Sequence, residues 1–287
     1  MIAAQLLNGL MEGAMLFLMA SGLTLIFGVS RVINFAHGSF FMLGAFLGHD
    51  IYALISPTSI GGLLAGMVGA GAAVMVVGAL CEAFLLRRVY RAEMLLQLLV
   101  TVAVVLIVRD IVKLIWGVHM VSTPMPRELA GAIKLGANYL PVYPLTVAAI
   151  GLAVGILTFA VIRFTRTGVL LRATADDPGM VGLLGVNQAH VFTGVFAAGC
   201  FLAAMAGALI APFRTINYLL DTTIIIEAFV VVVIGGLGSL WGALVGAVAF
   251  GIVKAFGVLY FERLAMVLIF LVMAAALVVR SLRSEGD

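Results

Sequence analysis

Long apolar segments constrain the fold of this chain more than any other feature of its sequence. Residues 60–86, rich in Gly, Ala and Val, exceed the roughly 20 residues that a helix needs to cross the hydrocarbon core of a bilayer. Only 10% of the chain is charged and 64% is hydrophobic, whereas about 25% of a soluble domain is charged. The chain is therefore predicted to be integral to a membrane. Long runs, rather than alternating ten-residue segments, favour helices over a β-barrel.

The predicted fold class is an all-α polytopic membrane protein with about eight hydrophobic segments in one transmembrane domain, 1–287. Six segments follow directly from the apolar runs: 5–29, 35–55, 60–86, 94–116, 145–162 and 191–211. Residues 117–140 are predicted to form an ordered external loop. Residues 224–281 fit either two full spans, or a re-entrant half-helix broken near 235–238, a return helix and a final span. We favour the second, because it keeps Arg280 and Arg283 on the cytoplasmic side.

Arginine clusters set the expected topology. Two clusters end apolar segments: Arg87, Arg88 and Arg91, and then Arg163, Arg166 and Arg172. Two segments separate them, so both lie on one side, which the positive-inside rule makes cytoplasmic. No Lys or Arg precedes Arg31, which argues against a cleaved signal peptide. We therefore expect a retained first helix, an extracytoplasmic N-terminus and a cytoplasmic C-terminus.

A short, well-terminated helix is predicted inside the cytoplasmic loop 163–190. Asp176 or Asp177 suits the N-cap, Pro178 the first helical position and Gly185 the C-cap. Its apolar side chains are those of Met180, Val181, Leu183 and Leu184. A helix of under about two turns is not stable alone, so this face should dock. It either lies on the bilayer or on its own protein, or fits a groove in a cytoplasmic partner.

Two polar or glycine-rich breaks interrupt the apolar segments. In the first, Asn34, His37 and Gly38 lie between two apolar arms. His37 is either a proton relay or a hydrogen-bonding group that fixes neighbouring helices; a helix partner is the usual answer for Asn34. The second break holds Gly235, Gly236, Gly238 and Ser239. Either Gly238, Gly242 and Gly246 pack one helix face through small residues, or two broken helices surround a path.

Charged residues within apolar segments are the remaining candidates. Glu227 lies either at the external interface or facing a path, and Glu12 at an interface. Arg109, Asp110 and Lys113 either pair at the outer interface or line the path. Cys81 and Cys200 fit buried hydrophobes. No metal-binding spacing and no nucleotide-binding Walker A motif occurs, and the arginines indicate topology rather than a nucleic-acid partner.

Three motifs give the chain a resemblance to a known family. Residues 22–28 (GLTLIFG), 32–38 (VINFAHG) and 42–46 (MLGAF) resemble the first signature of branched-chain amino acid ABC transporter permeases of the LivH type. Residues 172–177 (RATADD) and 184–187 (LGVN) resemble the cytoplasmic coupling loop of that family. Residues 233–243 (VIGGLGSLWGA) resemble its late glycine motif, which related sugar and urea permeases share more loosely. The Pro178-Gly179 pair departs mildly from the expected helix formers.

The resemblance implies an inner-membrane permease subunit that imports Leu, Ile or Val. It implies a LivM-like second permease, two ATPase subunits that bind ATP-Mg, and a periplasmic binding protein; the chain itself would bind no cofactor. Coupling to the ATPases is expected at Asp176, Asp177, Pro178, Met180, Val181, Leu183, Leu184, Gly185 and Asn187. The translocation path is expected at Asn34, His37, Gly38, Glu227, Gly235, Gly236, Gly238 and Ser239.

Other functions stay open at this point. The chain could transport urea, amides or another small polar solute within the same family. A passive channel or proton-coupled carrier would instead use His37, Glu227 and the charges near Arg109. An enzyme is disfavoured, because no nucleophile–base pair or metal spacing is present.

Overall fold

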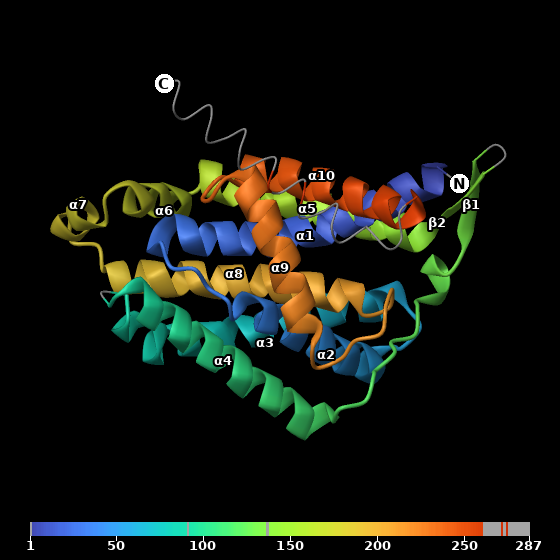
Figure 1. Cartoon of the computed structure of the whole chain (residues 1–287), viewed down its shortest axis with the longest axis horizontal. Helices are drawn as coiled ribbons and strands as arrows, with labels where there is room; N and C mark the ends of the chain where they lie inside the picture. Colours follow the sequence, from blue (N-terminus) through green and yellow to red (C-terminus); the bar gives the residue numbers. More distant parts are fainter. Residues whose placement is uncertain (1, 91, 136–137, 261–270, 272–273, 275–287) are drawn as a thin grey trace.

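The computed structural model describes residues 2–90, 92–135, 138–260, 271 and 274. The described chain is mainly helical (Figure 1). Its α-helices are α1 (Ile2–Ser30), α2 (His37–Ile55), α3 (Ile60–Phe84), α4 (Met94–Trp116), α5 (Val142–Phe164), α6 (Arg166–Asp176), α7 (Pro178–Leu183), α8 (Gln188–Ile210), α9 (Leu220–Gly235) and α10 (Leu240–Tyr260). Two short 3-10 helices, η1 (Leu86–Arg88) and η2 (Arg127–Leu129), and two strands, β1 (Ala132–Leu135) and β2 (Asn138–Pro141), complete it.

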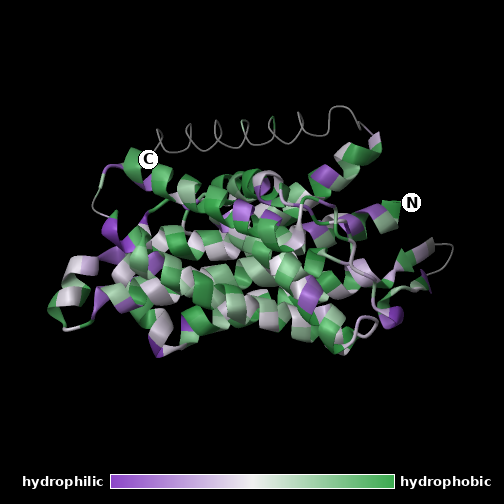
Figure 2. Ribbon diagram, turned by 90° about the horizontal axis from the view of Figure 1, so that it is seen from below, coloured by the Kyte–Doolittle hydropathy of each residue, from purple (hydrophilic) through white to green (hydrophobic). Residues whose placement is uncertain are grey.

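Within these residues, 6 helical segments are long and apolar enough to cross a membrane: α1, α2, α3 continued through η1, α5, α8 and α10. Hydrophobic residues cover most of this bundle, as Figure 2 shows. The structure thus confirms the prediction of an all-α polytopic membrane protein. The predicted final span and the C-terminal orientation fall outside the described residues.

The core of the bundle is organised around α1 and α8. Helix α1 packs against α10, α8 and α5, and α8 packs against α3 and α2. In Figure 1 α1, α5, α8 and α10 run side by side, while α9 crosses them obliquely. The described charges lie mostly toward the ends of the helices, whereas buried Met, Leu and Phe side chains fill the middle.

Helices α2 and α8 approach each other backbone to backbone. A Cβ atom added at Gly207 would lie 2.0 Å from the carbonyl oxygen of Phe41, and one added at Gly44 would lie 2.3 Å from the Cα of Ala204. Only glycine fits such contacts. This is the mode in which helices pack in lipid, where small residues allow close approach and van der Waals contact.

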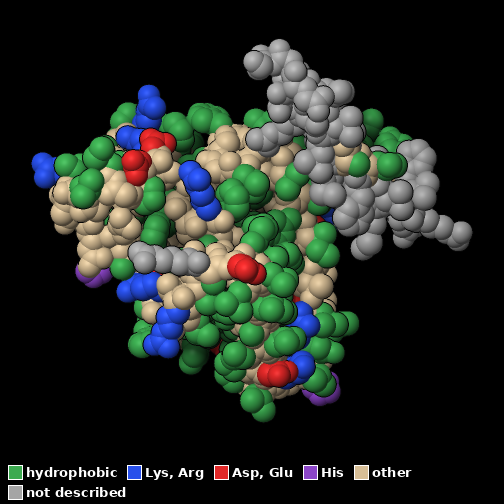
Figure 3. Space-filling model, turned by 60° about the vertical axis from the view of Figure 1, so that its left-hand side comes forward, with side chains coloured by type: hydrophobic (Ala, Val, Ile, Leu, Met, Phe, Trp, Pro, Cys, Tyr) green, Lys and Arg blue, Asp and Glu red, His purple; other side chains and the backbone are tan. Residues whose placement is uncertain are grey.

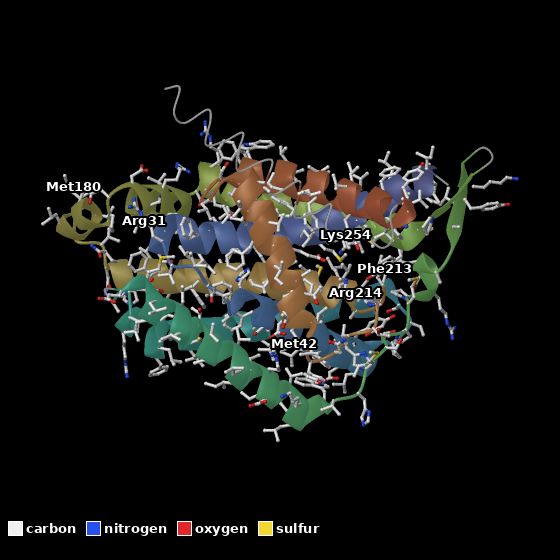
Figure 4. The ribbon with its side chains drawn as sticks, viewed as in Figure 1. Arg31, Met42, Met180, Phe213, Arg214 and Lys254 are labelled. Atoms are coloured by element: carbon white, nitrogen blue, oxygen red, sulfur yellow. The ribbon has the colours of Figure 1, made fainter. Side chains whose placement is uncertain are left out.

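The two ends of the bundle differ in composition. One end carries Arg31, η1, α6 and α7, and we call it the arginine-rich end (Figures 1 and 4). Figure 3 turns this end forward and shows Lys and Arg side chains among hydrophobic ones. The opposite end, the hairpin end, carries η2, β1 and β2. Arg87 and Arg88 lie at the same end as Arg163, Arg166 and Arg172, as the sequence predicts, and Arg91 falls outside the described residues.

The predicted external loop contains a small sheet, which the sequence did not indicate. Strands β1 and β2 pair antiparallel, with Ile133 opposite Leu140. An isolated bridge joins Val121 to Ile216, where the backbone N–H of each residue donates to the other's carbonyl at 2.9 Å. This bridge ties the segment after α4 to the segment after α8, so the hairpin end is an ordered surface.

Candidate translocation and coupling sites

The first break, 31–36, lies inside the bundle. Helix α1 ends at Ser30, and Arg31 adopts a left-handed conformation with φ of 55°, which turns the chain. Nε2 of His37, the first residue of α2, lies 3.0 Å from the carbonyl oxygen of Met19. Met19 precedes the end of α1 by 11 residues, about 16 Å of helix. Helix α2 therefore begins partway along α1, not beside its end.

Asn34 and His37 hold this break in place. Both side chains are fully buried. The Asn34 side-chain oxygen accepts the backbone N–H of Ala36 at 3.1 Å, which shapes the turn into α2. Gly22 and Gly38 permit close contact here, because a Cβ at Gly38 would lie 2.6 Å from the Asp221 carbonyl oxygen. His37 thus contacts α1 and Asn34 shapes the turn, while Nδ1 of His37 and Nδ2 of Asn34 are buried without a hydrogen-bond partner among the described residues.

The second break is a tight turn between α9 and α10. Gly236 and Gly238 have φ of 94° and 85°, and the Ser239 hydroxyl oxygen accepts the Gly242 N–H at 3.1 Å, capping α10. A Cβ at Gly242 would lie 1.7 Å from the Gly235 oxygen. One part of the sequence analysis was wrong here: Gly238 does not share a helix face with Gly242 and Gly246, because it precedes the helix.

Helix α9 has the length of a half-span. Its 16 residues measure about 24 Å, less than the roughly 30 Å of a hydrocarbon core. It begins against Gly38 and ends near the arginine-rich end, where a Cβ at Gly238 would lie 3.6 Å or more from Gly28. This geometry agrees with the predicted re-entrant half-helix.

A buried ion pair joins three helices beside the first break. Asp221 lies in the first turn of α9 and is 2% exposed. It is 2.9 Å from Arg109 of α4 and accepts a hydrogen bond of 3.2 Å from the Ser39 hydroxyl of α2. Lys113 and Asp110, by contrast, form an exposed pair along α4. The three charges predicted together near the end of α4 therefore have separate roles.

A second group of charges lies between α1, α9 and α10, and we call Glu12, Glu227 and Lys254 the ionic cluster. Lys254 Nζ lies 2.8 Å from Glu227 Oε1 and 3.3 Å from Glu12 Oε2. All three side chains are largely buried. Glu227 is thus paired inside the bundle, not free at an interface. The sequence analysis missed Lys254, although a lysine within an apolar segment is itself a signal of function.

Two cavities border the ionic cluster. The larger, of about 150 Å³, is lined by Glu12 and Lys254 together with Asn8, Met11, Phe213 and Val258. The smaller, of about 10 Å³, is lined by Glu12, Lys254, Glu227 and Arg214. In Figure 4 Lys254, Phe213 and Arg214 lie close together in the half of the bundle nearer the hairpin end.

Helix α7 forms a compact knob at the arginine-rich end. The Asp177 carboxylate accepts the Met180 N–H at 3.0 Å, and Pro178 follows as the first helical residue. Asp177, not Asp176, is the N-cap, since Asp176 is the last residue of α6. The helix ends in a Schellman motif: Gly185 has φ of 84°, and the Val186 N–H donates to the Val181 carbonyl.

The apolar side chains of α7 divide into two groups. Leu183, Leu184 and Met180 are 84%, 76% and 57% exposed, and Met180 lies at the tip of the molecule in Figure 4. Val181 was predicted on the same docking face, but it is buried, because it packs inward at the helix end. Asn187 lies outside the knob and caps α8 by accepting the Ala189 N–H at 3.0 Å.

The knob stands away from the bundle. A cavity of about 540 Å³ lies between α1, α5, α6 and the start of α8; Leu25, Thr167 and His190 are among its lining residues. Nearby, the buried Glu82 carboxylate pairs with Arg87 at 3.1 Å and accepts a hydrogen bond from Thr193 of α8. Helix α8 is thus held to α3 beyond the knob, while the knob itself is free to contact a partner.

Metal chemistry finds no support in the described part of the chain, where no group of three or more His, Cys, Asp or Glu side chains could hold an ion. Cys81 and Cys200 are free thiols, one half-buried and one buried.

Comparison with known proteins points to transport. Residues 5–277 match the family described as "Branched-chain amino acid transport system / permease component". The chain is 31% identical over 264 residues to the high-affinity branched-chain amino acid transport permease LivH of Escherichia coli K12, covering 89% of this chain and 86% of that protein. It is 28% identical over 265 residues to BraD of Pseudomonas aeruginosa, covering 88% and 85% of the two chains. No solved structure matches the chain.

Proposed function

Because the chain belongs to the branched-chain amino acid transport permease family, we propose that it is the permease subunit of an ATP-driven importer of Leu, Ile and Val. It acts as a multi-pass protein of the bacterial inner membrane, with the arginine-rich end in the cytoplasm. A LivM-like second permease completes the membrane part. A periplasmic binding protein delivers the amino acid to the permease pair.

The observation that carries this proposal is the exposed knob α7. Leu183 and Leu184 each expose more than three quarters of their surface on a helix fixed at both ends by its caps. Exposed apolar side chains on a rigid element mark a docking site for another protein. Two ATPase subunits, one for each permease, are the partners that this position suits.

Movement of the knob supplies the coupling. The sequence has no Walker A motif, so ATP-Mg is bound by the ATPase subunits, which the permease contacts through α7. The knob connects to α8 through 184–187, and Asn187 fixes the start of that helix. Closure of the ATPase pair on ATP would therefore displace α8 and switch the permease between its outward-open and inward-open states.

The broken helices border the path in this proposal. Half-helices and unwound segments are tolerated in a membrane where they are buried in protein or line a cavity. Asn34, His37 and Gly38 shape one break, and the turn 235–239 shapes the other. Glu227 lies between them and lines a cavity.

Reconstitution tests the function. Proteoliposomes with both permeases, the ATPases and the binding protein should accumulate labelled leucine only when ATP is enclosed with the ATPases, and removal of this chain should abolish uptake. Uptake without ATPases would instead indicate a passive or proton-coupled carrier. Preference for urea or an amide over leucine would assign a different substrate within the family.

A further inference from the structure

Glu12 and Lys254 line both cavities, and Glu227 and Arg214 line the smaller one, so charges of both signs border this pair of cavities. Glu12 and Glu227 supply two carboxylates, and Lys254 and Arg214 supply two cations. Charges inside a membrane segment are costly, and they are retained where they pair or where they meet a solute. Lys254 can balance only one of the two carboxylates, and Arg214 pairs with neither, which leaves capacity for a further cation and a further anion.

Two groups in this cluster have unused hydrogen-bonding capacity. Oε2 of Glu12 is buried and has no hydrogen-bond partner among the described residues, although Lys254 lies 3.3 Å away. The Arg214 guanidinium makes no hydrogen bond or ion pair with a described residue, yet Arg214 lines the small cavity beside Glu12. A carboxylate accepts several hydrogen bonds, and a guanidinium binds a carboxylate through two parallel ones.

The larger cavity has apolar lining residues beside its charged and polar ones. Met11, Phe213 and Val258 line it. Its volume of about 150 Å³ matches that of an engineered protein cavity that holds benzene, so a branched aliphatic side chain fits. A zwitterion with a hydrophobic side chain needs charged groups to bind its ammonium and carboxylate, and an apolar surface to bind its side chain. Both kinds of group are present here.

We infer that Glu12, Arg214 and the cavity beside Lys254 form a binding site on the translocation path for the ammonium and carboxylate groups of the amino acid. The substrate ammonium binds Glu12, its carboxylate binds Arg214, and its side chain lies against Phe213. This inference rests on the proposed function and adds to it the site where the permease holds its cargo. Without substrate, Lys254 pairs with both carboxylates and so joins α1, α9 and α10.

Arg214→Gln is the first test, because this change removes no ion pair that the described structure contains. Its matched control is Arg127→Gln, which changes an exposed arginine of η2 at the same end. Leucine uptake and ATP hydrolysis are measured together in the complete reconstituted importer with saturating loaded binding protein. Arg214→Gln should lower uptake at least tenfold while hydrolysis changes less than twofold, and Arg127→Gln should match the wild type.

A second variant separates binding from a purely structural clamp. The triple change Glu12→Leu, Glu227→Leu and Lys254→Met replaces the ionic cluster by apolar side chains of similar volume, which commonly preserves stability. We expect the folded triple variant to lose leucine uptake at least tenfold.

The outcomes separate the inference from the function on which it rests. Suppose the wild type takes up leucine. If Arg214→Gln takes it up equally well, or if Arg127→Gln loses as much uptake as Arg214→Gln, the proposed binding site is wrong, but the proposed importer function stands. Full uptake by the folded triple variant would also overturn the proposed binding site. If the wild type transports no amino acid at all, the proposed function fails first. An unfolded triple variant leaves the decision to Arg214→Gln.

Discussion

The knob α7 and the ionic cluster reverse the usual arrangement of side chains in opposite ways. The knob exposes leucines to water, whereas the cluster places charges inside an apolar bundle. Both arrangements cost free energy unless something covers the leucines or meets the charges. We propose that each marks a contact with another molecule: a protein at the arginine-rich end, and a charged solute toward the hairpin end.

The two regions also differ in what holds them. The knob is ordered by contacts within about ten residues, from the Asp177 cap to the Val186 N–H. The ionic cluster joins residues 12, 227 and 254, which only the packing of three helices brings together. Changes to helix packing should therefore damage the interior while the knob persists, and changes to the knob should leave the interior folded.

The largest effect is expected from Gly207→Val. The new side chain would meet the Phe41 backbone, which cannot move as a flexible side chain does. We expect a loss of about 4 kcal/mol in the free energy of unfolding, at the severe end for one substitution. Unfolding in sodium dodecyl sulfate measures it. Gly194→Val on the same helix is the control, because a Cβ there meets nothing within 4 Å. Equal stability of the two variants would contradict the α2–α8 contact.

Removal of the buried carboxylate should come next. Asp221→Ala leaves Arg109 without its partner, at an expected cost of about 3 kcal/mol in the same unfolding assay. Asp110→Ala breaks the exposed pair with Lys113 and should cost less than about 0.5 kcal/mol. The double variant Arg109→Met, Asp221→Leu should recover most of the loss. A failure of Asp110→Ala to differ from Asp221→Ala would show that burial does not set the cost.

A charged knob should separate function from stability. Leu183→Glu with Leu184→Glu should lower ATP-driven leucine uptake at least tenfold, equivalent to about 1.4 kcal/mol, because the docking surface is lost. The unfolding free energy should stay unchanged, since both side chains are exposed. The control is Ile133→Glu, a half-exposed residue of β1 at the other end. Normal coupled uptake by the double variant would reject the docking role of α7.

The smallest effect is expected from the cap of the knob. Asp177→Ala removes the acceptor for the Met180 N–H, and N-cap loss costs about 1 kcal/mol. Hydrogen exchange of the α7 amides should quicken about fivefold, with a modest loss of uptake. Asp177→Asn should retain protection, and Asp176→Ala should have no effect. Faster exchange in Asp176→Ala instead would reassign the cap.

The contrast between local contacts in the knob and distant contacts in the ionic cluster explains which features could be predicted from the sequence. The limits and caps of α7 follow from Asp177, Pro178 and Gly185, because capping depends on near neighbours. The spans follow from apolar runs in the same way, and the two breaks follow from the glycines and polar residues in them. The prediction that Val181 lies on the docking face was wrong, because packing against the rest of the loop decides which apolar side chain of α7 points inward.

Pairings between distant residues were beyond sequence reasoning. The ion pair of Asp221 with Arg109 could not be foreseen, because Arg109 lies more than a hundred positions earlier in the chain. Lys254 was overlooked because one lysine in an apolar segment has no visible partner until α9 and α10 fold together. The sequence shows which residues are charged, but the packing of the helices decides which charges pair.

The glycine contacts between α2 and α8 have a mechanical consequence. Where Gly44 and Gly207 bring the two backbones together, no side chain lies between them to absorb strain. The pair should behave as one stiff rod. A force on α7 would then act on α8 at Asn187, which caps it. Through the packed pair it would move the buried start of α2, where Ser39 donates a hydrogen bond to Asp221. A movement of α7 by a few ångströms would thus be transmitted to the first break almost undiminished.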